Sequence, residues 1–168
     1  IPLPNGRVAL VIADVADKGM GAALYMALSR TLIRTYAVAY HTRPDYVMRV
    51  ANQRILKDTR ADLFVTVFYA VLDPISGELT YCNAGHNPPC WLRADSSGTP
   101  LLRRTGIPLG IYEDVTWEQV NVRLQAGDRL VLYTDGITEA QNAAQECLGD
   151  KPFYELLKTL RGQSAAAI

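Results

Sequence analysis

The stretch Val8-Ala-Leu-Val-Ile-Ala-Asp14-Val-Ala-Asp-Lys-Gly-Met-Gly-Ala-Ala-Leu24 decides the fold of this chain. Residues 8–13 are all apolar and show no helical period, so we predict a short strand that is buried on both faces. That strand ends on the carboxylate of Asp14. From about residue 22 to residue 39 apolar side chains recur at helical spacing, which predicts an amphipathic helix after an acidic, glycine-rich turn.

A second stretch, Leu130-Val-Leu-Tyr-Thr-Asp135-Gly136, follows the same pattern. It predicts an apolar strand that begins after the turn Gly127-Asp128 and stops on Asp135. A carboxylate at the edge of a core is costly unless it meets a cation or hydrogen-bond donors. If strand pairing brings Asp14 and Asp135 together, the two carboxylates would suit a hard divalent cation such as Mg²⁺ or Mn²⁺.

The composition is that of an ordinary globular protein. The chain has 168 residues, 49% of them hydrophobic and 20% charged, which fits one domain. Lys plus Arg and Asp plus Glu balance at 17 each, so we expect no nucleic-acid partner, and no apolar run reaches the roughly 18 residues of a membrane span. Three cysteines without CxxC spacing indicate neither a disulfide framework nor a zinc site, so we expect a reducing cytoplasm. We expect Cys82 and Cys90, which flank a turn, to be buried, inert thiols.

The remaining sequence predicts an α+β fold built from hairpins. Thr42, Pro44 and Asp45 indicate the start of a second helix, with the Thr42 hydroxyl as its cap. Further strands are predicted at residues 64–72, 78–83, 90–93, 101–103, 116–122 and 130–135, with a surface turn at 94–100, a helix at 152–160 and another beginning near Ser164. Strands joined by hairpins, with two helices inserted after the first strand, predict an antiparallel β-sandwich with helices outside.

With these residues in hand, the chain resembles the metal-dependent protein phosphatases (the PPM, or type 2C, serine/threonine phosphatases). The resemblance is to the bacterial branch typified by stage II sporulation protein E and the anti-sigma-factor regulatory phosphatases. It covers nearly the whole chain and implies a β-sandwich flanked by helices. Five motifs in the expected order carry it: the stretch from Asp14 to Leu24, Phe64-Val-Thr-Val-Phe68, Asn83-Ala-Gly-His-Asn-Pro-Pro89, Gly106-Ile-Pro-Leu-Gly110 and Leu132-Tyr-Thr-Asp-Gly-Ile-Thr-Glu139.

The resemblance also implies a site with two Mn²⁺ or Mg²⁺ ions. In it Asp14 bridges both ions, the backbone carbonyl of Val15 ligates one of them, and Asp135 binds the other. Asp14 and Asp135 are therefore the predicted catalytic residues, whereas the sequence identifies no substrate-binding residue. The implied reaction is attack of a metal-activated water on phosphoserine or phosphothreonine. The implied substrate is a phosphorylated regulatory protein such as an anti-sigma-factor antagonist, and the phosphatase is often fused to sensory domains.

This sequence departs from the family pattern at its ends and after the first Asp. The family's first acidic motif, of the G-D-x-x-D kind, and its last strand with a final pair of acids lie outside the 168 residues. We therefore expect a single phosphatase domain truncated at both ends, with weak metal binding and little hydrolysis by this segment alone. Ala16-Asp17-Lys18-Gly19 stands where the family usually has Ser-Gly-His-Gly, which leaves Asp14 itself intact.

Other interpretations of the same residues remain open. The chain could be a non-catalytic relative that serves as a binding or regulatory module, although the presence of both Asp14 and Asp135 argues against this. A haloacid-dehalogenase-type phosphatase with Asp14 as nucleophile would need an acid at position 16 and a parallel sheet. Asp17 is expected to cap the following helix, and His86 to tie its own turn through side-chain hydrogen bonds.

Overall fold

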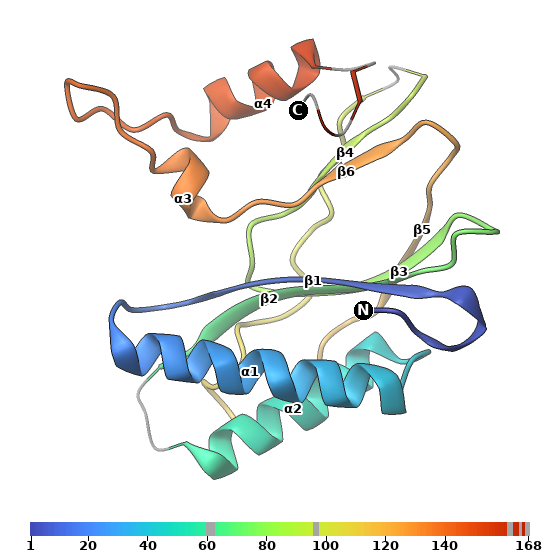
Figure 1. The fold of residues 1–168 in the computed structure, drawn as a ribbon, viewed down its shortest axis with the longest axis vertical. Coiled ribbons are helices and arrows are strands. Elements are labelled where there is room, and N and C mark those ends of the chain that lie inside the picture. Colours follow the sequence, from blue (N-terminus) through green and yellow to red (C-terminus); the bar gives the residue numbers. More distant parts are fainter. Residues whose placement is uncertain (60–62, 96–97, 161–162, 165, 167–168) are drawn as a thin grey trace. The chain divides into compact units, whose positions relative to one another are not determined.

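The computed structural model describes residues 1–59, 63–95, 98–160, 163, 164 and 166 (Figure 1). The chain divides into two compact units. The first comprises Ile1–His86 and Arg104–Leu124, and the second comprises Asn87–Arg103 and Gln125–Ile168. Each unit has its own sheet and its own buried core. The expectation of one truncated domain stays a prediction, and the helix expected near Ser164 falls largely outside the described residues, as does part of the turn at 94–100.

The first unit is a four-stranded sheet with two helices against one face (Figure 1). Its strand order is β1-β2-β3-β5, and every pair of neighbouring strands among the described residues is antiparallel. A parallel sheet of the haloacid-dehalogenase kind is therefore wrong for this unit. The elements are the short 3-10 helix η1 (Pro4–Gly6), β1 (Val8–Val15), α1 (Met20–Ala39), α2 (Pro44–Asp58), β2 (Val65–Leu72), β3 (Glu78–Ala84) and β5 (Val120–Arg123).

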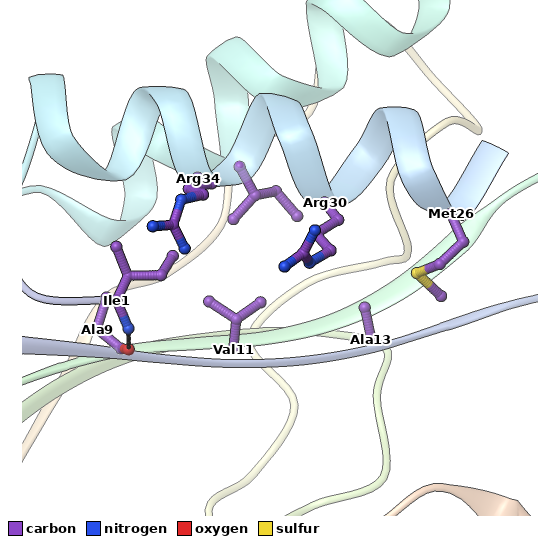
Figure 2. A pocket seen from close by; sticks show the side chains of 8 residues that line it. Ile1, Ala9, Val11, Ala13, Met26, Arg30 and Arg34 are labelled. Carbon is purple, nitrogen blue, oxygen red and sulfur yellow. Dashed lines mark hydrogen bonds between the residues drawn. The ribbon is translucent and has the colours of Figure 1, made fainter. Parts of the chain in front are cut away.

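The strand predicted to be buried on both faces, β1, is an edge strand. Within the described residues only β2 pairs with it along its whole length, and most of its residues are half-buried, whereas the central strand β2 is buried on both faces. An apolar run of this length does not distinguish a central strand from an edge strand. Between β1 and α1 lies a hollow of about 270 Å³ (Figure 2). It is lined by Ile1, Ala9, Val11 and Ala13 on the strand side and by Met26, Arg30, Ile33 and Arg34 on the helix.

The start of α1 differs from the prediction. The helix begins at Met20, two residues earlier than expected, and its N-cap is Gly19 at φ +92°. Asp17 is therefore not the cap, and its carboxylate instead accepts the N–H of Lys18 at 2.7 Å. Among the described residues no helix, α1 included, has the length and apolar character needed to cross a membrane.

The second helix begins as predicted but without the predicted cap. Pro44 is its first residue, where the missing N–H costs nothing because the first turn of a helix has no intrahelical acceptor. The N-cap is Arg43, so the Thr42 cap is wrong. The Arg43 guanidinium instead pairs with the carboxylate of Asp45 at 2.8 Å, and this hydrogen bond holds the pKa of Asp45 below its usual value.

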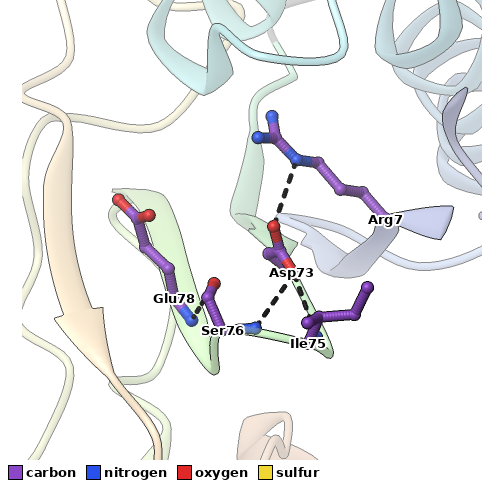
Figure 3. Close-up of polar contacts among 5 residues, drawn as sticks. All are labelled: Arg7, Asp73, Ile75, Ser76 and Glu78. Carbon is purple, nitrogen blue, oxygen red and sulfur yellow. Dashed lines mark hydrogen bonds and ion pairs between the residues drawn. The ribbon is translucent and has the colours of Figure 1, made fainter. Parts of the chain in front are cut away.

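The turn between β2 and β3 confirms the predicted hairpin (Figure 3). The Asp73 carboxylate accepts the backbone N–H groups of Ile75 at 3.0 Å and Ser76 at 3.2 Å, which closes the turn. These two donors, Ser76 first, hold the pKa of Asp73 below its ordinary value. Arg7 lies 3.8 Å from the same carboxylate, and Gly77 supplies the positive φ of +74° that the turn requires.

The second unit contains a two-stranded sheet and two helices. Its elements are β4 (Cys90–Leu92), β6 (Arg129–Val131), α3 (Asp135–Thr138) and α4 (Asp150–Thr159), with β4 and β6 antiparallel. The predicted strand at 101–103 is reduced to a single bridge between Cys90 and Leu101. Asp128 fixes the turn before β6, because its carboxylate accepts hydrogen bonds from the Trp91 indole and from the backbone N–H groups of Ala94 and Gln125.

Asn52 is a buried polar residue in the first unit that links α2 to the loop at 106–112. It is 1% exposed; its Nδ2 donates to the Tyr112 carbonyl at 2.8 Å, and its Oδ1 accepts the N–H of Gly110 at 2.8 Å. We expect Asn52→Leu to lower the free energy of unfolding by about 1–3 kcal/mol, because it leaves these backbone groups unsatisfied. Urea unfolding measures the change, and exposed Gln53→Leu on the same helix is the control. An Asn52→Leu variant as stable as its control would show that the two hydrogen bonds contribute nothing.

Candidate metal centre

Asp14 lies near the end of β1, directly opposite Thr66 of β2. Its neighbours Ala13 and Val15 pack against the helix-covered core, so by strand alternation Asp14 points to the opposite face of the sheet. Asp14 is half-buried. The Val15 carbonyl accepts the N–H of Asp17 at 2.9 Å, and because a carbonyl oxygen has two lone pairs, this bond leaves one for a metal ion.

Asp135 lies in the second unit, at the first residue of the short helix α3 rather than at the end of a strand. The predicted strand is shorter than expected, because β6 ends at Val131. Asp135 is exposed, and its backbone carbonyl accepts the N–H of Glu139 at 2.7 Å and the hydroxyl of Thr138 at 3.2 Å. An acid is favourable at this end of a helix because of the exposed N–H groups there. The meeting of Asp14 with Asp135 joins residues of different units and stays a prediction.

The chemistry of the donor atoms fits a hard divalent cation. The first unit offers the Asp14 carboxylate and the Val15 carbonyl on consecutive residues, and the second offers the Asp135 carboxylate. All are oxygen donors, which Mg²⁺ and Mn²⁺ prefer. Within the part of the chain that the structure describes, no three or more His, Cys, Asp or Glu side chains form a metal-binding group. Mg²⁺ commonly binds through one or two carboxylates and keeps several waters, so a sparse donor set is suited to it.

A hydrogen-bonded network that the sequence did not predict contacts the backbone carbonyl of Asp14. The Thr66 hydroxyl is 3.2 Å from the Asp14 carbonyl oxygen and 2.8 Å from Nδ1 of His86, which is 1% exposed. The expectation that His86 ties its own turn stays a prediction, and the structure adds a contact of its ring with Thr66 of β2. The turn is tied by Asn83, whose Oδ1 accepts the His86 N–H at 2.9 Å. The only sequence signal for Thr66 was its place inside the motif Phe64-Val-Thr-Val-Phe68.

The two buried cysteines, Cys82 and Cys90, offer no activated nucleophile. Cys82 and Cys90 are fully buried, as predicted. Burial raises the pKa of the Cys82 thiol to about 12 and that of the Cys90 thiol to about 11. Both thiols are therefore protonated at neutral pH, whereas the thiolate is the form that attacks a substrate or binds a metal.

Comparison with known proteins gives a family and close structural neighbours. The family model of stage II sporulation protein E (SpoIIE) matches residues 4–168. RsbU of Bacillus subtilis (strain 168), which carries the name phosphoserine phosphatase, is 31% identical over 132 residues, covering 79% of this chain and 39% of RsbU. A crystal structure of the RsbU and RsbW domains of Rv1364c from Mycobacterium tuberculosis superposes with a TM-score of 0.78 at 28% identity, covering 93% of this chain and 43% of that one.

A second solved structure supports the fold class. The PP2C phosphatase domain of SpoIIE from Bacillus subtilis, with a fragment of its regulatory domain, matches with a TM-score of 0.75 at 18% identity. The match covers 95% of this chain and 44% of that chain, and at this identity it bears on the fold alone. The predicted α+β fold of the phosphatase type, with antiparallel sheets and helices, is confirmed. The chain spans less than half the length of each of these relatives.

Proposed function

Because the chain belongs to the SpoIIE family of type 2C protein phosphatase domains, we propose that it is a Mn²⁺- or Mg²⁺-dependent serine/threonine protein phosphatase. The observation that carries the proposal is the family match over residues 4–168, which includes all of the motifs that contain acids of the site. The RsbU relative is named a phosphoserine phosphatase, which supports phosphoserine as the bond that is hydrolysed.

In this proposal the protein supplies the oxygen donors that hold the ions. Asp14 would bridge two ions, the Val15 carbonyl would ligate one, and Asp135 would hold the other. Bound divalent ions would lower the pKa of a coordinated water, so that hydroxide is available near neutral pH to attack phosphorus. Their positive charge would also hold the phosphate. The direction of the Asp14 side chain, away from the helix-covered core of the first unit, supports such a role. The protonated, buried thiols of Cys82 and Cys90 are not available as nucleophiles, which is consistent with direct attack by water.

The substrate and setting follow from the family. We propose a phosphorylated regulatory protein of the anti-sigma-factor-antagonist kind as substrate, and sensory domains fused to the phosphatase in the natural protein. The relatives are longer than this chain, which leaves room for such domains in them. The cysteines of the chain are free thiols, which fits a reducing compartment such as the cytoplasm.

A metal-dependence assay tests the proposal. The natural protein that contains this sequence and the 168-residue chain are each incubated with a phosphoserine peptide, with Mn²⁺, Mg²⁺ or EDTA. We expect the natural protein to release phosphate only with Mn²⁺ or Mg²⁺, EDTA to stop the release, excess Mn²⁺ to restore it, and the 168-residue chain alone to be much slower. Hydrolysis that survives EDTA would exclude the metal-dependent reaction. No hydrolysis by the natural protein at saturating Mn²⁺ would favour the non-catalytic module.

A further inference from the structure

Two residues outside the expected ligand set, Thr66 and His86, form a hydrogen-bonded network that ends at the backbone carbonyl of Asp14. We propose that they are positioning residues, which hold the peptide bond between Asp14 and Val15 and thereby aim the two metal donors of the first unit. The proposal rests on the proposed function, because it gives these residues a role toward the same metal site. It adds a role for two of the five motifs, those that contain Thr66 and His86, within a single hydrogen-bonded network.

The direction of each hydrogen bond in the network follows from the atoms present. A carbonyl oxygen can only accept, so the single proton of the Thr66 hydroxyl goes to the Asp14 carbonyl, 3.2 Å away. The hydroxyl must then accept from His86, whose Nδ1 lies 2.8 Å from it. The network therefore requires the form of His86 that carries a hydrogen on Nδ1. An apolar side chain of the same shape at position 66 would remove both hydrogen bonds at once.

His86 is anchored well enough to act as a fixed point. Its N–H donates to Asn83 Oδ1 at 2.9 Å, and its carbonyl accepts from Arg104 Nε at 3.2 Å. Gly85, just before it, has φ +72°, and a Cβ there would lie 2.7 Å from the ring of Pro108, so only glycine fits this turn. The imidazole is thus held by the loop after β3, while the hydroxyl that it contacts belongs to β2 and the carbonyl at the end of the network belongs to β1.

The position of the Asp14 carbonyl explains how the network would act on a metal. This carbonyl belongs to the peptide group that links Asp14 to Val15. A hydrogen bond to it restricts rotation of that peptide group, and such a rotation would reorient the Asp14 side chain and the Val15 carbonyl. The last backbone bond to the neighbouring segment is made by the Ala16 N–H to the Phe64 carbonyl at 3.0 Å, and Asp17 next to it has a φ of +154°, which is unusual for a residue with a side chain. A ligand pair at the end of an edge strand needs such support, because metal donors must be held within about 0.5 Å of the productive geometry.

Matched variants of the natural protein separate the hydroxyl from its packing. Thr66→Val keeps the shape and removes the hydroxyl, Thr66→Ser keeps the hydroxyl, and Thr80→Val on the neighbouring strand β3 is the control. We expect Thr66→Val to weaken equilibrium Mn²⁺ binding by about 10–100-fold, the cost typical of an outer-shell partner, with KM for the phosphopeptide changed much less. Thr66→Ser and Thr80→Val should bind Mn²⁺ nearly as the wild type does. His86→Leu should resemble Thr66→Val, and His86→Asn, which keeps a donor near the Nδ1 position, should recover part of the affinity.

Amide hydrogen exchange in the metal-free protein provides an independent measurement. If the network holds the end of β1, exchange at residues 15–17 speeds up in Thr66→Val but not in Thr66→Ser, while exchange in α2 stays unchanged. Unchanged exchange and Mn²⁺ affinity in Thr66→Val would overturn the proposal, as would a Thr66→Ser variant as impaired as Thr66→Val. If the wild type binds no Mn²⁺ and hydrolyses nothing, the proposed function fails, and faster exchange at 15–17 would still show that Thr66 positions this segment.

Discussion

Asp14→Asn in the natural protein is expected to lower kcat/KM for a phosphoserine peptide by at least about 100-fold, because loss of a direct ligand should cost more than loss of an outer-shell partner. Asparagine keeps the size of the side chain and one oxygen but removes the negative charge that a hard cation requires. Equilibrium Mn²⁺ binding should weaken in parallel. The urea unfolding curve should change little, because Asp14 is half-buried and lies on the face of its sheet opposite the helix-covered core.

The chain offers a matched control three residues away. Asp17 is an exposed carboxylate on the same turn, and its hydrogen bond to the Lys18 N–H can also be made by an asparagine oxygen. Asp17→Asn should therefore keep nearly wild-type activity at saturating Mn²⁺. Wild-type activity in Asp14→Asn would refute the assignment of Asp14. An equal loss in both variants would point to the net charge of the turn rather than to one ligand.

The sequence predicted the first unit well wherever local chemistry decides the structure. Both long helices, the strand at 64–72 and the hairpin turn closed by Asp73 all follow from periodicity and turn residues. The errors have two causes, tertiary context for the place of β1 in its sheet and local backbone conformation for the start of α1. The run at 8–13 reads the same in a central and in an edge strand, and only pairing reveals that β1 is an edge. The N-cap of α1 is Gly19 and not Asp17. Gly19 has a positive φ, and no side chain caps the helix.

The site could be predicted in part, for a similar reason. Asp14 was selected as a candidate because a carboxylate ending an apolar strand is conspicuous in the sequence, and its role as a ligand stays a prediction. Thr66 was not identified, because a threonine in a β-rich run is ordinary and only strand pairing shows that it lies opposite Asp14 on the adjacent strand β2. His86 was assigned to its own turn because a sequence displays neighbours along the chain, and not the contact with β2 that the fold creates.

Asp135→Asn is the second change from which we expect a large effect, again a loss of at least about 100-fold in kcat/KM at a fixed, sub-saturating Mn²⁺ concentration. The reason is the same loss of a charged oxygen donor, here from the first turn of α3. Glu139→Gln is the control, because Glu139 is an exposed acid directly after the same helix. If Glu139→Gln loses as much activity as Asp135→Asn, the charge around α3 matters rather than one specific ligand.

The double variant Asp14→Asn/Asp135→Asn decides whether the two acids serve one centre. Residues that act as a unit lose their function together. The kcat/KM of the double variant should therefore lie within about tenfold of that of the less active single variant. Independent sites would instead multiply the two losses to about 10,000-fold or more. Because the two residues belong to different compact units, this cycle tests their meeting directly in solution. A multiplicative loss would separate Asp135 from the metal site and leave only the donors of the first unit, Asp14 and Val15, with the Thr66 and His86 network behind them.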